Sequence, residues 1–164
     1  MIVRRAEEKD AEVIAQINVQ TWQCAYKGIV ADSVLEARKA DEKRIATWAG
    51  IIQSNERVVL VCEYDGAVAG YLAAGPARDD YGAENEIYAL YVKPDFQQKG
   101  IGSALIKKYK EVIQNQNFYL YMLKKNERAA GFYLKNGGKV CEEFARHMTI
   151  GEQELEEVCY FFKK

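Results

Sequence analysis

The chain has 164 residues and a formal net charge of -1, so it has no general positive field that attracts nucleic acid or anionic lipid. Hydrophobic residues make up 49% and charged residues 29%, a balance that predicts a globular fold throughout. The longest apolar runs, such as Ala67–Ala74, are far shorter than the ~18 residues that span a bilayer, and Met1–Arg5 leads into charged residues rather than an export segment. We expect one cytoplasmic domain over residues 1–164.

The first half of the chain predicts a strand, two helical stretches and a hairpin. Apolar residues recur at helical spacing in both helical stretches, and an Asp-Gly pair between two β-rich segments is a hairpin signal. In chain order these elements are Met1–Arg5, Asp10–Tyr26, Ser33–Gly50, Val58–Glu63 and Val68–Ala74.

The second half alternates strands and helices. The predicted strands are Ile87–Val92, Phe118–Leu123, Lys139–Ile150 and Glu154–Phe162, and the predicted helices are Ile101–Ile113 and Asn126–Leu134. Pro94 stops the first strand because proline cannot donate to a sheet ladder, and Asn126 stands at a helix N-cap. Strands with helices between them indicate an α/β fold of the α+β kind, with a mixed sheet covered by helices.

The cysteines and the single histidine are scattered along the chain. No Cys-x-x-Cys pair occurs and the histidine stands alone, so the closely spaced ligands of a zinc site are absent and no metal site is predicted. We interpret the cysteines as small buried hydrophobic residues and the histidine as structural. These residues are Cys24, Cys62, Cys141, Cys159 and His147.

A glycine loop, Gln97–Gly102, follows a predicted strand and opens a predicted helix. The first N–H groups of a helix lack partners and the helix dipole favours negative charge, so such a loop is a ready phosphate site. Taken alone, the same glycines also fit a simple turn. The loop sequence excludes two nucleotide-binding motifs. The Gly-x-Gly-x-x-Gly motif of dinucleotide folds is absent because the position three after Gly102 is not glycine, and the Gly-Lys-Ser/Thr of a Walker loop is also absent.

Two blocks together resemble the GNAT superfamily of acetyl-CoA-dependent N-acetyltransferases. The first is the glycine loop after the strand Leu90–Pro94, which looks like the superfamily's cofactor motif. The second, Asn126–Gly138, places an asparagine seven residues before a tyrosine, in the superfamily's order and at about its separation. The resemblance implies a mostly antiparallel central sheet of six to seven strands flanked by about four helices.

The resemblance also implies an acetyl-CoA site along the middle of the sheet. In the family the strands matching Ile87–Val92 and Phe118–Leu123 splay apart, and the pantetheine arm lies in the gap, bonded by main-chain groups as an added strand would be. The loop holds the pyrophosphate. The implied cofactor-binding residues are Leu90, Tyr91, Val92, Gln97, Gln98, Lys99, Gly100, Ile101, Gly102, Ser103 and Asn126.

Acetyl transfer to an amine needs a neutral amine and a proton for the leaving thiolate. The resemblance gives Tyr133 the role of the acid, although packing of its helix on the sheet also explains an aromatic residue there. For the base we predict Glu86, because alternation along the strand places it on the face of Leu90 and Val92. Glu84 is the alternative, and both can also be solvated loop carboxylates.

In the family the acceptor is bound after the first strand, here by Thr21–Ile29. Trp22 and Tyr26 can form an aromatic wall there or simply pack in the core. Nearby acidity favours a cationic acceptor such as a polyamine, an amino sugar or a protein amine. The acidic residues are Asp79, Asp80, Glu84 and Glu86.

Two other classes of function are less consistent with the sequence. A non-catalytic acyl-CoA-binding regulatory module would keep the cofactor site without turnover, and the intact Tyr133 argues against it. A nucleic-acid-binding protein would need a basic stripe that the chain lacks. A homodimer through the closing strands is a further expectation, because Val158, Tyr160 and Phe162 alternate with residues that can face a partner.

Overall fold

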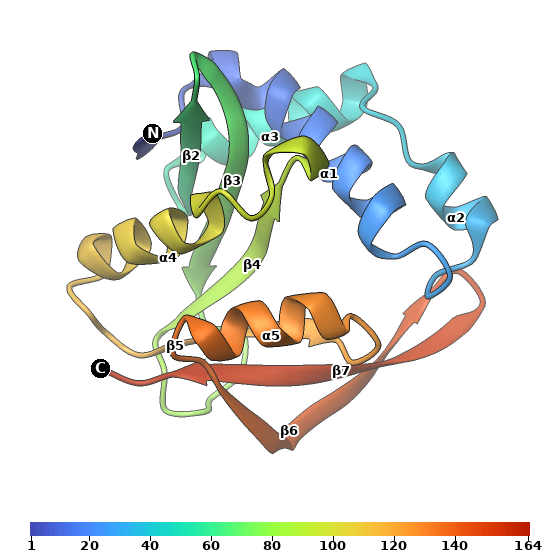
Figure 1. Cartoon of the computed structure of the whole chain (residues 1–164), viewed down its shortest axis with the longest axis vertical. Coiled ribbons are helices and arrows are strands. Elements are labelled where there is room, and N and C mark those ends of the chain that lie inside the picture. The colour runs from blue at the N-terminus through green and yellow to red at the C-terminus, as the bar shows by residue number, and fades with distance from the viewer.

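The computed structural model describes residues 1–164, and its chain is organised around a seven-stranded sheet (Figure 1). The strand order is β1-β2-β3-β4-β5-β7-β6, with β4 and β5 parallel and all other neighbours antiparallel. The strands are β1 Ile2–Arg5, β2 Val58–Tyr64, β3 Ala67–Pro76, β4 Asn85–Val92, β5 Phe118–Leu123, β6 Lys139–Ile150 and β7 Gln153–Phe162. The α-helices are α1 Ala11–Ala25, α2 Asp32–Ala37, α3 Glu42–Ser54, α4 Ile101–Val112 and α5 Glu127–Lys135, and the short 3-10 helices are η1 Glu8–Asp10 and η2 Pro94–Phe96. The predicted mixed, mostly antiparallel sheet is confirmed.

Helices cover both faces of the sheet. On the α4/α5 face, α4 buries Leu105 and Tyr109 against the strands. On the opposite α1/α3 face, α1 buries Ile14 and Ile17. α2 lies beside the β6–β7 hairpin, where Leu35 packs with residues of both strands (Figure 1). None of these helices is long and apolar enough to cross a membrane.

The middle of the sheet is split between β4 and β5. The two strands pair only over Asn85–Ile87 and Phe118–Leu120 and then separate. A β-bulge lies just where they part: Tyr88 is an extra residue, because its neighbours Ile87 and Ala89 oppose consecutive residues of β3. A bulge bends the strand and shifts the alternation of side chains beyond it. Past Ile87, the β5-facing backbone of β4 has no ladder partner.

One predicted element is wrong. The stretch Ser33–Gly50 is not one helical unit but two helices, α2 and α3, with a break at 38–41. Arg38 has an extended ψ of 120°, which ends α2. The side chain of Asp41 then caps α3 by accepting from Arg44 N at 2.9 Å. Asp41, a short polar residue of the kind that begins helices, was therefore the signal that the sequence reading missed.

Of the two closing strands through which a homodimer is predicted, β7 does not offer an edge. It lies inside the sheet between β5 and β6. Tyr160 and Phe162 belong to the core on the α4/α5 face, and Val158 packs against it. The edge of the sheet on this side is β6.

Candidate active site

The glycine loop forms the N-terminus of α4. Gly100 is the N-cap with a φ of 82°, a left-handed conformation that favours glycine. The first intrahelical bond runs from Ala104 N to Gly100 O at 2.9 Å, so the N–H groups of 101–103 have no helical partner. Gly102 is required by close packing, because a Cβ there would lie 2.8 Å from the Phe132 ring. The loop is thus a backbone cradle for an anion.

A cavity of about 710 Å³ joins this loop to the gap between β4 and β5. Leu90 and Val92 line it and pack on the α4/α5 side of the sheet. Ala89, Tyr91 and Tyr121 also line it, although their side chains belong to the opposite face. The cavity therefore passes between the separated strands and is lined from both faces. Its volume is typical of a small-molecule or cofactor site.

Most of the predicted site residues meet at this cavity. Those that line it are Tyr26, Leu90, Tyr91, Val92, Gln97, Gln98, Gly100, Ile101, Gly102, Ser103, Asn126 and Tyr133. Those that do not line it are Trp22, Glu84, Glu86 and Lys99. Lys99 Nζ instead lies 5.0 Å from the ring centroid of Phe96 and 5.3 Å from that of Tyr64, a cation–π arrangement.

Helix α5 brings Asn126 and Tyr133 to the cavity. Asn126 is the predicted N-cap, since its Oδ1 accepts from Ala129 N at 3.2 Å. Tyr133 is 8% exposed, and burial raises the pKa of its phenol above the ordinary value. The hydroxyl therefore stays protonated throughout the neutral pH range. A buried phenol in this state can donate a hydrogen bond or a proton.

Side chains of α1 and β4 line the cavity from the α1/α3 face. The Tyr91 hydroxyl accepts from Trp22 Nε1 at 3.0 Å, and Tyr26 packs edge-on against Trp22 with ring centroids 4.7 Å apart. The Arg38 guanidinium covers the indole ring at 3.8 Å. Trp22 therefore supports the aromatic wall, and Tyr26 and Tyr91 form it. Thr21 also lines this end, and its Oγ1 is buried without any hydrogen-bond partner.

Glu86 lies on the face opposite to the predicted one. Leu90 and Val92 share the α4/α5 face with Ile87, because the bulge at Tyr88 shifts the alternation by one residue. Glu86 precedes Ile87 and so points to the other face. The predicted placement beside Leu90 and Val92 is wrong for this reason.

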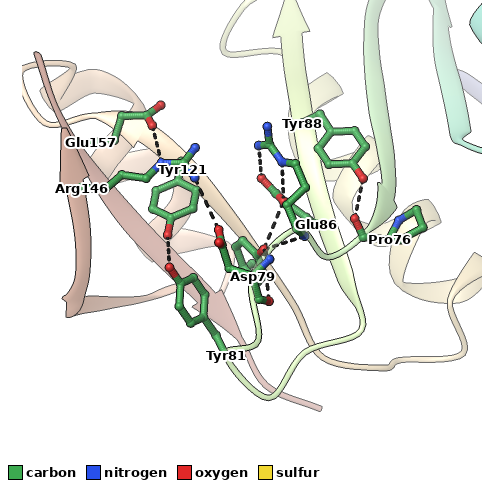
Figure 2. Close-up of polar contacts among 10 residues, drawn as sticks. Pro76, Asp79, Tyr81, Glu86, Tyr88, Tyr121, Arg146 and Glu157 are labelled. Carbon is green, nitrogen blue, oxygen red and sulfur yellow. Dashed lines mark hydrogen bonds and ion pairs between the residues drawn. The ribbon is translucent and has the colours of Figure 1, made fainter. Parts of the chain in front are cut away.

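The Glu86 carboxylate is fully buried and saturated with donors (Figure 2). Arg78 donates from Nε at 2.9 Å, from Nη2, and from its main-chain N at 3.3 Å. The Tyr119 hydroxyl donates at 3.1 Å while accepting from the main-chain N of Asp79 at 2.9 Å. These contacts fasten the β3–β4 connection to the sheet.

The acidity predicted beside the site does not face the cavity. Glu86 is matched by Arg78, and Asp79 lies 3.5 Å from a nitrogen of Arg146. Asp80 and Glu84 are exposed. The four residues named as a source of negative field, Asp79, Asp80, Glu84 and Glu86, do not line the cavity, so that electrostatic basis for a cationic acceptor is wrong.

Thr21, Cys24 and Ala25 line the cavity from the stretch Thr21–Ile29 that was expected to bind the acceptor, although none of the three was singled out. Sequence reasoning missed Arg128 and Lys135 of α5, which also line it. Cys24 is exposed rather than buried as predicted, whereas Cys62 and Cys159 are buried. A signal was present in α5, because Arg128 and Lys135 are seven residues apart and so share one face of a helix.

An anion cradle, a cavity through a split sheet and a buried phenol are features of an acyltransferase that takes its acyl group from a CoA thioester. Residues 12–138 match the model of the acetyltransferase (GNAT) family, and the chain belongs to this family. It is therefore an N-acetyltransferase with acetyl-CoA as cosubstrate. The sequence-based assignment is confirmed.

Relatives match the chain over most of its length. YuaI, an uncharacterized N-acetyltransferase of Bacillus subtilis, is 26% identical over 160 residues, which cover 95% of this chain and 89% of YuaI. The spermidine N(1)-acetyltransferase of Thermoplasma acidophilum is 23% identical over 145 residues, 84% of this chain and 88% of that protein. The structure of the PaiA N-acetyltransferase of T. acidophilum with coenzyme A has a TM-score of 0.77 at 22% identity and covers 99% of this chain and 98% of its own. The last comparison establishes the shared fold.

Proposed function

We propose that the protein acetylates a primary amine by direct attack of the amine on the thioester of acetyl-CoA. The cavity carries this proposal, because it joins the anion-binding loop, the unpaired edge of β4 and Tyr133 in one space. The reaction requires the protein to hold the phosphates, to align the extended arm and to protonate the thiolate.

The N-terminus of α4 is the proposed pyrophosphate site. The unpartnered N–H groups of 101–103 and the positive end of the helix dipole favour an anion there. Gln98 and Ser103 also line the cavity, and their side chains can add donors. Arg128 and Lys135 of α5 bring positive charge to the cavity wall.

The pantetheine arm is proposed to lie along β4 beyond its last pair with β5. Main-chain groups of Leu90 and Val92 lie on this stretch, where an extended chain with amides can pair as an added strand. Gln97 Nε2 already donates to Val92 O at 3.1 Å, so this bond lies at the end of the stretch nearest the glycine loop. Asn126 lines the cavity from α5 and contacts the arm in this arrangement.

The reaction forms a C–N bond and breaks a C–S bond. The neutral amine attacks the carbonyl carbon, and its nitrogen becomes positively charged. This nitrogen then loses a proton to solvent, and the thiolate leaves. Tyr133 donates its phenolic proton to the thiolate and regains one from solvent. Because burial raises the pKa of Tyr133, the phenol is in its protonated form at neutral pH when the thiolate leaves.

The acceptor amine is proposed to occupy the end of the cavity lined by Thr21, Tyr26 and Tyr91. A polyamine, an amino sugar and a protein amine all present a primary amine of suitable size. The likeness to a spermidine N(1)-acetyltransferase supports the polyamine among them.

Thiol release from acetyl-CoA in the presence of an amine panel tests the proposed function. The wild type is expected to release thiol with at least one primary amine, and Tyr133→Phe is expected to lower kcat by about 10²- to 10⁴-fold with an unchanged Kd for acetyl-CoA. Binding of acetyl-CoA without turnover on any amine would support a regulatory module instead. Failure to bind acetyl-CoA would exclude both functions.

A further inference from the structure

We propose that Glu157 of β7 takes a proton from the ammonium group of the acceptor through a bridging water, an inference that rests on the proposed acetyl transfer. Glu157 is 8% exposed. An ionised carboxylate in such a place is costly unless a partner compensates it. The surroundings of Glu157 leave part of that compensation to a ligand.

The position of Glu157 in β7 puts it between two clusters of the α1/α3 face. Alternation places Leu155, Glu157 and Cys159 on the same face of the strand. Leu155 packs in the cluster that contains Tyr26 of the cavity wall. Cys159 packs in the cluster joined by Tyr121, which lines the cavity from β5. Glu157 does not itself line the cavity, but it lies between the two groups that border the acceptor end.

Glu157 has far fewer donors than Glu86. Its Oε2 accepts from Arg146 Nε at 2.8 Å, and no protein donor contacts its Oε1. Glu86 accepts from three groups of Arg78 and from the Tyr119 hydroxyl. A carboxylate with an unused oxygen can accept a hydrogen bond from an ammonium group or from a bridging water. Glu157 therefore has an oxygen open to a water, which Glu86 lacks.

The charges around Glu157 favour a cation. Arg146 is shared between Glu157 at 2.8 Å and Asp79 at 3.5 Å, so the guanidinium that pairs with Glu157 serves two carboxylates. Figure 2 shows Glu157, Arg146 and Tyr121 together, on the other side of the view from Glu86. The guanidinium lies 3.6 Å from the ring centroid of Tyr121, which brings the group to the cavity wall.

The negative charge of Glu157 also reaches the phenols on the other side of the cavity. Burial raises the pKa of both Tyr26 and Tyr91, and the charge of Glu157 raises both further. Tyr26 and Tyr91 line the acceptor end together with Thr21, whose Oγ1 has no partner. Hydroxyl oxygens, aromatic rings and a carboxylate are the groups that bind a protonated amine.

The proton step is balanced within this arrangement. The ammonium nitrogen gives one proton to the Glu157 carboxylate through a bridging water and becomes the nucleophile. Glu157 returns to its ionised form by releasing that proton to solvent, so the whole reaction releases one proton. The titratable groups around Glu157 are Arg146 of β6, which pairs with it, Asp79 and Tyr121, which contact Arg146, and Tyr26 and Tyr91, whose pKa the charge of Glu157 raises.

Glu157→Gln tests this role, because the amide oxygen can still accept from Arg146 while the negative charge is lost. At saturating acetyl-CoA and neutral pH, kcat/KM for the amine is expected to fall by about 10²-fold. The loss should shrink as the pH approaches the pKa of the amine, because solvent then supplies the neutral nucleophile. Glu157→Asp keeps a carboxylate and should retain the pH profile of the wild type. Glu156→Gln is the matched control, since the adjacent Glu156 pairs with Lys124 at 2.7 Å, and it should leave kcat/KM unchanged.

The Kd for acetyl-CoA and the near-ultraviolet circular dichroism of each variant report whether the fold and cofactor site are intact. Wild-type turnover together with an unchanged pH profile of kcat/KM in Glu157→Gln overturns this inference alone. A pH-independent loss in both Glu157→Gln and Glu157→Asp also overturns it, because a structural role predicts that pattern. Absence of turnover by the wild type on every amine overturns the proposed function and this inference with it.

Discussion

Replacement of Glu86 by glutamine separates a structural carboxylate from a catalytic base. Four donor groups converge on the carboxylate, three from Arg78 and one from Tyr119. Glutamine offers one acceptor oxygen, so its own NH2 group must face donors that previously met an oxygen. One buried donor left without an acceptor costs roughly 1–3 kcal/mol. The Arg78 side chain is 57% exposed and can turn to water, so we expect a total loss of about 2 kcal/mol.

For a chain of 164 residues this loss corresponds to a fall in Tm of roughly 4–8 °C. Thermal unfolding followed by circular dichroism measures it, with Glu84→Gln as the matched control, because Glu84 is exposed and two residues away. Well below the transition, kcat/KM of Glu86→Gln should stay close to that of the wild type. An unchanged Tm with a loss of kcat/KM that recovers at high pH would show that Glu86 is the base, and the reasoning from its donors would be wrong.

Three more predictions follow from the site and its surroundings. Tyr133→Phe should lower kcat without shifting the alkaline limb of the pH–rate profile below pH 9, because burial holds the pKa of this phenol above its ordinary value; a wild-type limb that disappears in the variant would contradict this. Gly102→Ala should raise the Kd for acetyl-CoA and cost about 1–3 kcal/mol of stability, because the new methyl meets the Phe132 ring at 2.8 Å; calorimetric titration and thermal unfolding check both effects, and unchanged values would refute the packing argument. Burial raises the pKa of Tyr119 to about 12, so its contribution to the free energy of unfolding is complete below about pH 10 and is lost as the pH rises towards 12. Tyr119→Phe should therefore lessen the fall of stability with pH in that window in urea titrations, and an equally steep fall would contradict the assignment.

The parts of the fold that depend on local sequence were predictable. Asn126 caps α5 as predicted, and the Asp65-Gly66 pair turns the β2–β3 hairpin with φ values of 51° and 80°. The glycine loop was recognisable because a positive φ at Gly100 and unpartnered helix N–H groups are properties of a few consecutive residues. The cofactor half of the cavity was therefore predictable from short stretches of sequence.

The acceptor half was not predictable, because it depends on contacts between distant segments. The bulge at Tyr88 arises from the register with β3 and moves Glu86 to the other face, which no alternation rule within β4 could reveal. Glu157 stands in a run of acidic residues that reads as a solvated edge, yet pairing of β7 between β5 and β6 buries it beside Arg146. Thr21 becomes notable only when its hydroxyl is found buried without a partner.

The most direct test of the account is mass spectrometry of a mixture of primary amines incubated with acetyl-CoA and the wild-type protein, with the released thiol measured in the same samples. Acetyl transfer through the cavity predicts at least one N-acetylated amine in an amount equal to the free thiol, and little of either with Tyr133→Phe. Thiol release without any acetylated amine, or equal product from wild type and Tyr133→Phe, would contradict it.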